Sequence, residues 1–511
     1  MAKSIKDVPG LEPKPIVGWL GNVAGMFSDP LNALTDLHKE YGDVLTISRG
    51  GNPHLFFSGA GKHHTLFVFG SKYNHQLMSN SDVFHSGSIL STLFPYGEVD
   101  ARRRVLQKLS IGLFGLNGET HRRQRRLIMP AFHKQRLNIY CDDIVRITNQ
   151  KLDNWKVGEQ IDIWREMMNL TLQIVAQCLF GLNALKESQA FGELIQTWIK
   201  LAVSPGVLLF QSDIPGLPYH RFVNISHELD SIVRNIINQI RPTSEKNVDV
   251  LSLMLSAKDE NGEPAFTDDE IVGHSAIFFT AGHETSSNAL AWTFFLLSQH
   301  PHVMEKLRLE IDRVLGSAPP SIDHLKAMPY LDAIVKESLR LMPPAPLSAR
   351  MVAEPVEVGG YELPVGTEVV FSAFHTHRDS SIYENPHQFI PERWETINPT
   401  AYEYIPFSTG IRSCVGMPLA LMEIPIIIAM VFQKFRLELS SNANVIPHIG
   451  LTMSPKHGMP MIVQPRDNNY NAGVGNVKGS IHKYIDLKPI NQFVIARSTS
   501  LKRQMHDEAI L

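Results

Sequence analysis

The sequence predicts one large, mainly α-helical domain with small β-sheets, and three observations support this prediction. Helical periodicity dominates residues 1–466, and no internal repeat or low-complexity linker interrupts it. The segments with β character are short and lie at residues 43–50, 64–70 and 356–373. The composition is 43% hydrophobic and 19% charged, which is typical of a globular chain that buries a large core.

Simple counts argue against several classes of function. A net charge of -3 gives no sign of a nucleic-acid partner. Three cysteines argue against a disulfide framework and favour a reducing compartment. The first residues hold no apolar run long enough for a signal peptide or a membrane anchor, and the apolar run at residues 289–297 is too short to cross a bilayer. We therefore expect a soluble, cytoplasmic protein without a membrane anchor.

The longest helix is expected to begin after Thr267 and to end before Pro301. Thr267 and Glu270 have the spacing of a capping box, and acidic residues fill the first turn, where they suit the helix dipole. Such a helix runs for about 32 residues, or roughly 48 Å. It is apolar on more than one face, which predicts a buried helix that crosses the domain.

Cys414 differs in its setting from the other two cysteines of the chain. A lone cysteine is most often a small buried hydrophobe, and this explanation fits Cys141 and Cys178, which lie in apolar helical patterns. Cys414 instead lies between Gly410 and Gly416, which let the backbone approach another group closely, and a long apolar helix follows. A thiolate at a helix N-terminus is stabilised by unbonded N–H groups and is a soft ligand that suits iron.

The segment around Cys414 matches the pattern F-x-x-G-x-R-x-C-x-G through Phe407, Gly410, Arg412, Cys414 and Gly416. It resembles the haem-binding signature of the cytochrome P450 superfamily, and Ser408 stands where many family members carry glycine. The resemblance implies the family fold, with haem b between a long central helix and the cysteine loop. It also implies that Cys414 is the axial thiolate of the iron, where it favours O–O bond cleavage.

The resemblance covers residues 10–465 and divides the chain in two. Residues 1–466 are expected to form the haem-thiolate domain, and residues 467–511 a C-terminal tail outside the family core. The tail begins with the Asn/Gly-rich stretch "DNNYNAGVGNVKG", which predicts a linker. It carries no cysteine, so it is not an attached iron–sulfur domain.

Glu337 and Arg340 are three residues apart in a helical pattern, so they share one face and are able to pair. Taken alone, this spacing fits a surface ion pair worth under about 1 kcal/mol. With Arg393, in the segment "FIPERW", the two residues resemble the Glu–Arg–Arg cluster of the family. The resemblance implies a structural role near the cysteine loop and no catalytic role.

Glu284 and Thr285 form an acid–alcohol pair inside the long helix. From the residues alone, this pair fits a capped or solvated polar patch, or a helix bend in which Thr285 bonds the carbonyl of Ala281. Gly282 costs about 1 kcal/mol of helix stability relative to alanine and is expected to leave room for a flat ligand beside the backbone. The resemblance implies that Glu284 and Thr285 are catalytic and deliver protons during oxygen activation.

Residues 102–136 carry ten lysines and arginines but one glutamate. A charge run of this kind usually forms a solvated helix face. The resemblance implies that His121 and Arg125, four residues apart, contact a haem propionate, with histidine where tryptophan is commoner. It gives Arg350 and Arg412 a similar role. The remaining basic residues are candidates for docking an acidic electron donor.

The resemblance implies a monooxygenase that inserts one oxygen atom of O2 into an apolar small molecule, such as a fatty acid or a terpenoid. No flavin or iron–sulfur motif is fused to the chain, so electrons are expected from a separate ferredoxin and reductase. The residues expected to face the substrate are Phe94, Leu208, Phe210, Phe278 and Met453, although core packing explains them equally well.

Three alternative functions stay open. They are a peroxide-driven haem enzyme, a fatty-hydroperoxide isomerase of the same fold, and a non-catalytic haem or lipid binder. Enzymes of the first two classes usually lack the acid–threonine pair, and a binder needs no path for protons, so Glu284 and Thr285 argue against all three.

Overall fold

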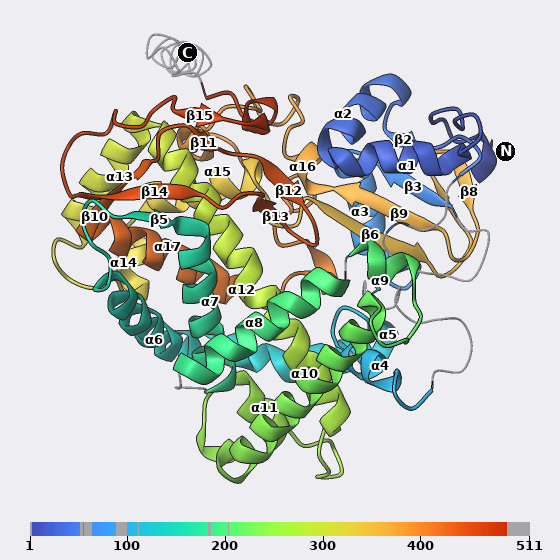
Figure 1. The fold of residues 1–511 in the computed structure, drawn as a ribbon, viewed down its shortest axis with the longest axis horizontal. Coiled ribbons are helices and arrows are strands. Elements are labelled where there is room, and N and C mark those ends of the chain that lie inside the picture. The colour runs from blue at the N-terminus through green and yellow to red at the C-terminus, as the bar shows by residue number, and fades with distance from the viewer. Residues whose placement is uncertain are drawn as a thin grey trace, which may run out of the picture.

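The computed structural model describes residues 3–51, 55, 64–87, 100–110, 112–181, 185–202 and 204–487. Within these residues the molecule is mainly α-helical (Figure 1). In chain order the α-helices are α1 (Gly18–Ser28), α2 (Pro30–Tyr41), α3 (Ser71–Ser79), α4 (Arg104–Ser110), α5 (Gly118–Ile128), α6 (Lys134–Leu152), α7 (Ile163–Phe180), α8 (Leu185–Ala202), α9 (Pro205–Leu209), α10 (Pro218–Ile240), α11 (Val250–Ser256), α12 (Asp268–Gln299), α13 (Pro301–Val314), α14 (Ile322–Lys326), α15 (Pro329–Leu341), α16 (Ala373–Thr376) and α17 (Met417–Lys434).

The central helix is α12, and its 32 residues match the expected length. The capping box is formed on both sides, because the Thr267 hydroxyl accepts from the Glu270 N–H at 3.2 Å and the Glu270 carboxylate accepts from the Thr267 N–H at 2.8 Å. The helix ends at Gln299, and Pro301 begins α13. Burial on several faces confirms that α12 crosses the core.

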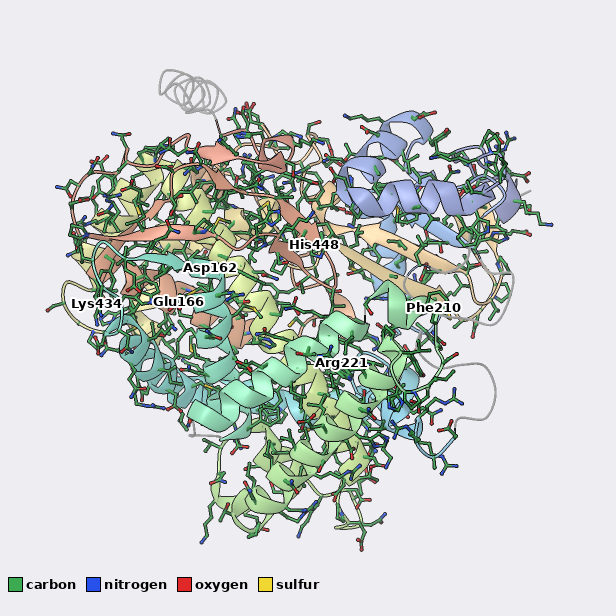
Figure 2. All side chains as sticks on the ribbon, in the orientation of Figure 1. Asp162, Glu166, Phe210, Arg221, Lys434 and His448 are labelled. Carbon is green, nitrogen blue, oxygen red and sulfur yellow. The ribbon has the colours of Figure 1, made fainter. Side chains whose placement is uncertain are left out.

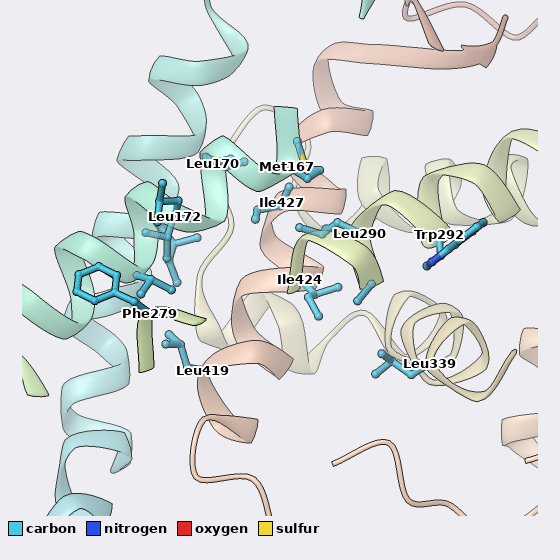
Figure 3. Packing of buried hydrophobic residues seen from close by; sticks show 14 of the residues in the cluster. Met167, Leu170, Leu172, Phe279, Leu290, Trp292, Leu339, Leu419, Ile424 and Ile427 are labelled. Carbon is cyan, nitrogen blue, oxygen red and sulfur yellow. The ribbon is translucent and has the colours of Figure 1, made fainter. Parts of the chain in front are cut away.

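Three helices pack around α12 in the part of the core shown in Figure 3. Side chains of α7, α12, α15 and α17 interlock there, as Figure 3 shows, and the labelled ones are Met167, Leu170, Leu172, Phe279, Leu290, Trp292, Leu339, Leu419, Ile424 and Ile427. Fully burying one large apolar side chain contributes about 1.5–3 kcal/mol, so this cluster is the main source of stability. It holds α12 rigidly against α17, the helix that follows Cys414.

The β-structure is divided among small sheets. The largest has the order β2-β3-β9-β6-β4 and lies beside α1 and α2 in Figure 1. Its strands are β2 (Val44–Leu45), β3 (Thr65–Val68), β9 (Glu368–Ser372), β6 (Leu347–Val352) and β4 (Phe84–His85). The others combine β1 (Lys3–Ser4), β8 (Tyr361–Leu363) and β7 (Val356–Val358); β10 (Phe435–Leu439), β14 (Pro460–Pro465) and β5 (Gln160–Asp162); β12 (Pro447–Ile449) and β13 (Met453–Pro455); β11 (Ala443–Asn444) and β15 (Val477–Lys478).

Among the described residues, one helix has the length and composition of a membrane span. It is α17, and 67% of its apolar stretch is buried inside the molecule. This apolar stretch is longer than the run at residues 289–297. Burial in the core explains why its residues are apolar, since the helix packs against α6 and α12.

The described part of the tail, residues 467–487, packs against the rest of the molecule and does not form a free linker. β15 pairs with β11, and Ile481, Tyr484 and Ile485 are buried. The Tyr484 hydroxyl donates to Asp29, between α1 and α2. The Asn/Gly-rich composition had suggested a linker because it reports local flexibility, whereas these contacts are made with distant parts of the chain.

Candidate functional site: the cysteine loop and the central helix

The backbone of the cysteine loop is folded tightly before α17. The Cys414 N–H donates to the Phe407 carbonyl at 2.9 Å, and the Ser413 N–H donates to the Gly410 carbonyl at 3.1 Å. Gly410 has a φ of 67°, and a Cβ there would lie 2.9 Å from the Met78 carbonyl oxygen, so only glycine fits. The loop therefore presents Cys414 at a fixed place just before the first turn of α17.

Opposing influences act on the pKa of the Cys414 thiol, and burial, which raises it above its ordinary value, is the largest of them. Burial raises the pKa of this thiol, while the N–H groups of Gly416 and Met417 and the charge of Arg125 lower it. The side chain is nevertheless exposed by accessible area, in contrast to Cys141 and Cys178, which are both buried. The Cys414 side chain is therefore accessible although many protein atoms lie around it.

Three arginines gather around this loop. Arg125 donates to the carbonyl and the hydroxyl of Ser413 at 2.7 and 2.9 Å. Arg412 donates to the carbonyls of Leu113 and Leu116 at 3.0 and 2.6 Å. Within the described part of the chain, Arg125, Arg412 and Arg350 form no ion pair with a carboxylate. Burial and the two neighbouring guanidinium groups lower the pKa of Arg412 to about 10, and burial does the same for Arg350.

His121 joins these arginines from α5. The side chain is buried, and its Nδ1 has no hydrogen-bond partner among the described residues. Burial lowers the pKa of His121 to about 4, and the charges of Arg412, Arg125 and Arg122 contribute to the shift. Buried cations without a counter-charge are costly, so the cluster of His121 and the three arginines fits a bound anionic group. Two carboxylates beside an iron that Cys414 ligates, as a haem presents them, would meet this need.

Glu337, Arg340 and Arg393 form a second charged cluster, which is fully satisfied. Arg340 pairs with both oxygens of Glu337 at 2.9 Å, and Arg393 donates to Glu337 at 2.9 Å. The Trp394 indole and the Ile390 N–H donate to the same carboxylate at 3.0 Å each. Burial alone would raise the pKa of Glu337, but these partners outweigh it and hold the pKa below its ordinary value.

Thr285 and Glu284 point their polar groups to different partners. The Thr285 hydroxyl donates to the Ala281 carbonyl at 2.6 Å, the bond that the sequence suggested. The Glu284 carboxylate accepts instead from the Thr452 hydroxyl at 2.6 Å. Burial raises the pKa of Glu284, and the Thr452 bond and the charge of Lys200 oppose this shift.

Gly282 lies where α7 and α12 approach each other. A Cβ at this position would lie 2.9 Å from the Cγ2 atom of Val175, on α7. The missing side chain therefore lets α7 approach α12 closely. A Cβ at this position would point toward a neighbouring helix, a direction that sequence spacing does not give.

The sequence analysis missed one buried acid, Glu423 on α17. Its exposed fraction is 1%, and burial raises its pKa to about 8 against a hydrogen bond from Ser286. Its Oε1 has no partner among the described residues. Ser286 directly follows Thr285, so a second titratable carboxyl lies against the same turn of α12. A single acid within the apolar run "LALMEIPIII" was the available signal.

The basic run at residues 102–136 does not form one unpaired face. Arg102, Lys108 and Arg122 each pair with a carboxylate, at 2.7, 3.3 and 2.6 Å. Arg126 is exposed and forms no ion pair with a described residue.

The residues expected to contact substrate are placed differently from one another. Phe210 has an exposed fraction of 64% and lies on the outside of the molecule after α9 (Figure 2). Leu208 is exposed as well, whereas Phe278 and Met453 are buried in the core. Phe94 lies outside the described residues.

Comparisons with known proteins point to one family. The profile of the family described as "Cytochrome P450" matches residues 8–461. A cytokinin hydroxylase of Arabidopsis thaliana is 31% identical over 70% of this chain and 72% of its own length. A cyclooctat-9-en-7-ol 5-monooxygenase of Streptomyces melanosporofaciens is 28% identical over 88% of this chain and 93% of its own length. A pentalenene oxygenase of Streptomyces avermitilis is 30% identical over 73% of this chain and 81% of its own length.

A solved structure described as "Retinoic acid bound cyanobacterial CYP120A1" has the same fold. It superposes with a TM-score of 0.75 and covers 91% of this chain and 100% of its own. The two sequences are 23% identical, so this similarity concerns the fold.

Proposed function

The chain belongs to the cytochrome P450 family and is a haem-thiolate monooxygenase, and we propose that it oxygenates an apolar, terpenoid-like small molecule. The names of two relatives support this substrate class, since one acts on cyclooctat-9-en-7-ol and another on pentalenene. Fatty acids are the alternative substrate class that the sequence left open.

We assign the cysteine ligand of the haem to Cys414. The observation that carries this assignment is its setting. Cys414 is accessible, receives the N–H groups of Gly416 and Met417, and lies beside arginines that form no ion pair with a described carboxylate. When bound, haem supplies the activation of dioxygen. The protein supplies the anionic ligand, because the start of α17 stabilises a thiolate.

The cationic cluster of His121, Arg125, Arg350 and Arg412 would hold the two propionates. Guanidinium groups bind carboxylates in a bidentate manner, and the Arg412 Nε lacks a partner among the described residues. Phe407, Gly410 and Gly416 serve this site by shaping the loop, and Gly410 does so at a φ of 67°.

Glu284 and Thr285 are proposed to handle protons. Glu284 is the acid of the pair, and burial brings its pKa closer to neutral pH, which suits a group that takes up and releases protons. Thr285 holds its hydroxyl against the Ala281 carbonyl, one turn away in α12. A positioned proton donor is typically worth about 10²–10⁴-fold in such a step.

Electrons are proposed to come from a separate ferredoxin-type donor that docks near Arg126. Arg126 is exposed and is not paired with a described carboxylate, whereas Asp82 and Glu119 neutralise Arg122. Arg126→Glu should therefore slow electron transfer at low ionic strength more than Arg122→Glu, and salt should reduce the difference. Equal rates for Arg126→Glu and wild type at low salt would place the donor elsewhere.

The substrate class is tested by titrating the purified enzyme with cyclooctat-9-en-7-ol, pentalenene and a medium-chain fatty acid. A bound substrate that displaces water from the haem shifts the Soret band. We expect this shift with the two terpenoids. A shift with the fatty acid alone would contradict the proposal.

Turnover with a ferredoxin system, compared with turnover on hydrogen peroxide alone, separates the monooxygenase from a peroxide-driven enzyme.

The assignment of Cys414 as the cysteine ligand of the haem iron is tested by Cys414→Ser, with Cys141→Ser and Cys178→Ser as matched controls. The Soret band of the reduced carbonyl complex lies at long wavelength under thiolate ligation, and Cys414→Ser should abolish it. Loss of that band in either control, with Cys414→Ser unaffected, would show that another cysteine is the ligand.

A further inference from the structure

One face of α12 is bonded to the hairpin of β12 and β13. Glu284, Asn288 and Trp292 are spaced by four residues, so they lie in a row on that face. The Thr452 hydroxyl donates to Glu284 at 2.6 Å, the Asn288 amide donates to Thr452 at 2.9 Å, and the Trp292 indole donates to the Met453 carbonyl at 3.0 Å. Three successive turns of α12 therefore hold the hairpin.

The donor and the acceptor of each side-chain hydrogen bond from Trp164 to Glu284 can be assigned in order, starting at Trp164. The Trp164 indole on α7 is a donor only, and it bonds the Asn288 Oδ1 at 2.7 Å. The Asn288 NH2 group must then face Thr452, whose oxygen accepts from it. The single Thr452 proton is consequently donated to Glu284 Oε1. A proton carried by the Glu284 carboxyl is therefore favoured on Oε2, because the hydroxyl oxygen of a protonated carboxyl is the weaker acceptor for the Thr452 bond.

The hairpin gives Thr452 little freedom to turn away. It joins two strands in which Ile449 is opposite Met453, and the Gly450 N–H donates to the Thr452 carbonyl at 3.0 Å. The Met453 N–H is bonded to the Pro344 carbonyl at 2.9 Å. Asn288 and Thr452 are both buried, and buried hydrogen bonds in a connected network reinforce one another.

We propose that Thr452 is the positioning residue for Glu284, holding Oε1 as a permanent acceptor and leaving Oε2 as the oxygen that exchanges protons. This proposal rests on the proposed role of Glu284 in proton delivery. The proton enters Oε2 from solvent water and leaves from Oε2, so the Thr452 bond stays intact throughout. A loop threonine distant in sequence from α12 thereby sets the acid strength and the orientation of the proton donor.

One charged side chain on another element, Lys200 on α8, influences the pKa of Glu284. Lys200 is exposed and forms no ion pair with Glu284 in the structure. Burial raises the pKa of Glu284, the Thr452 hydrogen bond lowers it, and Lys200 lowers it by less than Thr452. Thr452→Val keeps the shape of the side chain and removes the donor. It should move the titration of Glu284 to higher pH, because the ionised form loses a hydrogen bond.

The experiment is an infrared titration of the holoenzyme that follows the C=O stretch of protonated carboxyl groups. All proteins carry Glu423→Gln, since Glu423 titrates near pH 8 and would overlap, and Glu284→Gln identifies the Glu284 band. We expect Thr452→Val to shift the Glu284 midpoint to higher pH and Thr452→Ser to restore it. Lys200→Ala should shift the midpoint by less than Thr452→Val. Identical midpoints in wild type and Thr452→Val would overturn the proposal.

A second variant covers the case in which Thr452→Val does not fold, as judged by the carbonyl-complex band. Trp164→Phe frees the Asn288 amide to rotate, so it should shift the Glu284 midpoint in the same direction by a smaller amount. No shift in Trp164→Phe would then overturn the proposal. The proposed function is tested separately, by the product formed per electron in Glu284→Gln. An unchanged ratio there rejects the catalytic role of Glu284, while the infrared midpoints still decide the role of Thr452.

Discussion

Two clusters of buried arginines lie in this domain and differ in what surrounds them. Around Glu337, the guanidinium groups of Arg340 and Arg393 share one carboxylate and also bond several carbonyls. Around Cys414, Arg350 and Arg412 bond carbonyls and an amide oxygen, with no carboxylate among the described residues. A neutral acceptor satisfies a donor but does not compensate a charge. The charges of the first cluster are therefore balanced within the described residues, whereas we propose that the haem propionates balance those of the second.

The largest expected effect comes from breaking the cluster around Glu337. Glu337→Gln keeps the shape of the side chain but leaves Arg340 buried without its counter-charge, and this should cost about 3–5 kcal/mol in the free energy of unfolding. Urea unfolding measures the loss. The matched control is Asp323→Asn, which removes an exposed i,i+3 pair with Lys326 and should cost under about 1 kcal/mol. Equal losses in the two variants would show that burial does not distinguish the pairs.

Removal of an arginine from the cluster around Cys414 should have the opposite effect on the free energy of unfolding. Arg350→Met should leave the unfolding free energy of the haem-extracted protein unchanged or higher, because it removes an uncompensated buried charge. It should weaken haem retention by about 2–5 kcal/mol, measured as the rate of haem transfer to an acceptor protein. Arg393→Met is the matched control and should destabilise the protein with or without haem. Full haem retention in Arg350→Met would remove this residue from the cofactor site.

His121 makes the free energy of unfolding of the haem-extracted protein depend on pH. Its pKa is about 4 in the folded chain and 6.5 in the unfolded chain, so the unfolded chain binds the proton more readily. Stability from this group is therefore complete above pH 6.5 and falls as the pH decreases toward 4, by about 1 kcal/mol at pH 5.5. Urea midpoints of the haem-extracted protein should decrease less with acid in His121→Asn than in wild type. Bound haem should reduce this difference, and identical acid dependence of the two proteins would contradict the prediction.

The smallest effect is expected at Ser408, in the loop that precedes Cys414. Ser408 has a φ of 56°, a left-handed conformation that is costly for any residue except glycine, and its hydroxyl has no partner among the described residues. Ser408→Gly should raise the unfolding free energy by about 1 kcal/mol or less, since the flexibility of glycine in the unfolded chain offsets part of the gain. A lower urea midpoint in Ser408→Gly would show that the serine side chain stabilises the loop.

Features that depend on local sequence were predicted well. The capping box of α12, its length and the Thr285 bond to Ala281 follow from residues within one or two turns of each other. The family and fold followed from the short pattern around Cys414, and the comparisons confirm both. The roles assigned to the individual site residues stay predictions.

Apart from the Glu337–Arg393 contact, which the family resemblance implied, contacts between distant segments were not predicted. Thr452 bonds Glu284 across 168 positions, and no local pattern marks either residue as the partner of the other. The basic run of residues 102–136 appeared unpaired in sequence because the acids that neutralise Arg102 and Lys108 lie more than a hundred positions away. Glu423 carried a visible signal, an acid in an apolar helix, but its Ser286 partner lies on α12.

The bond between Tyr484 and Asp29 has a consequence for the order in which the protein is made. These residues are 455 positions apart, so at about 5–20 residues per second the ribosome adds Tyr484 roughly 20–90 s after Asp29. During that interval α1 and α2 have emerged, while the tail segment that packs beside them has not yet been synthesised. The N-terminal helices therefore complete this contact only after the segment that carries Tyr484 has been synthesised.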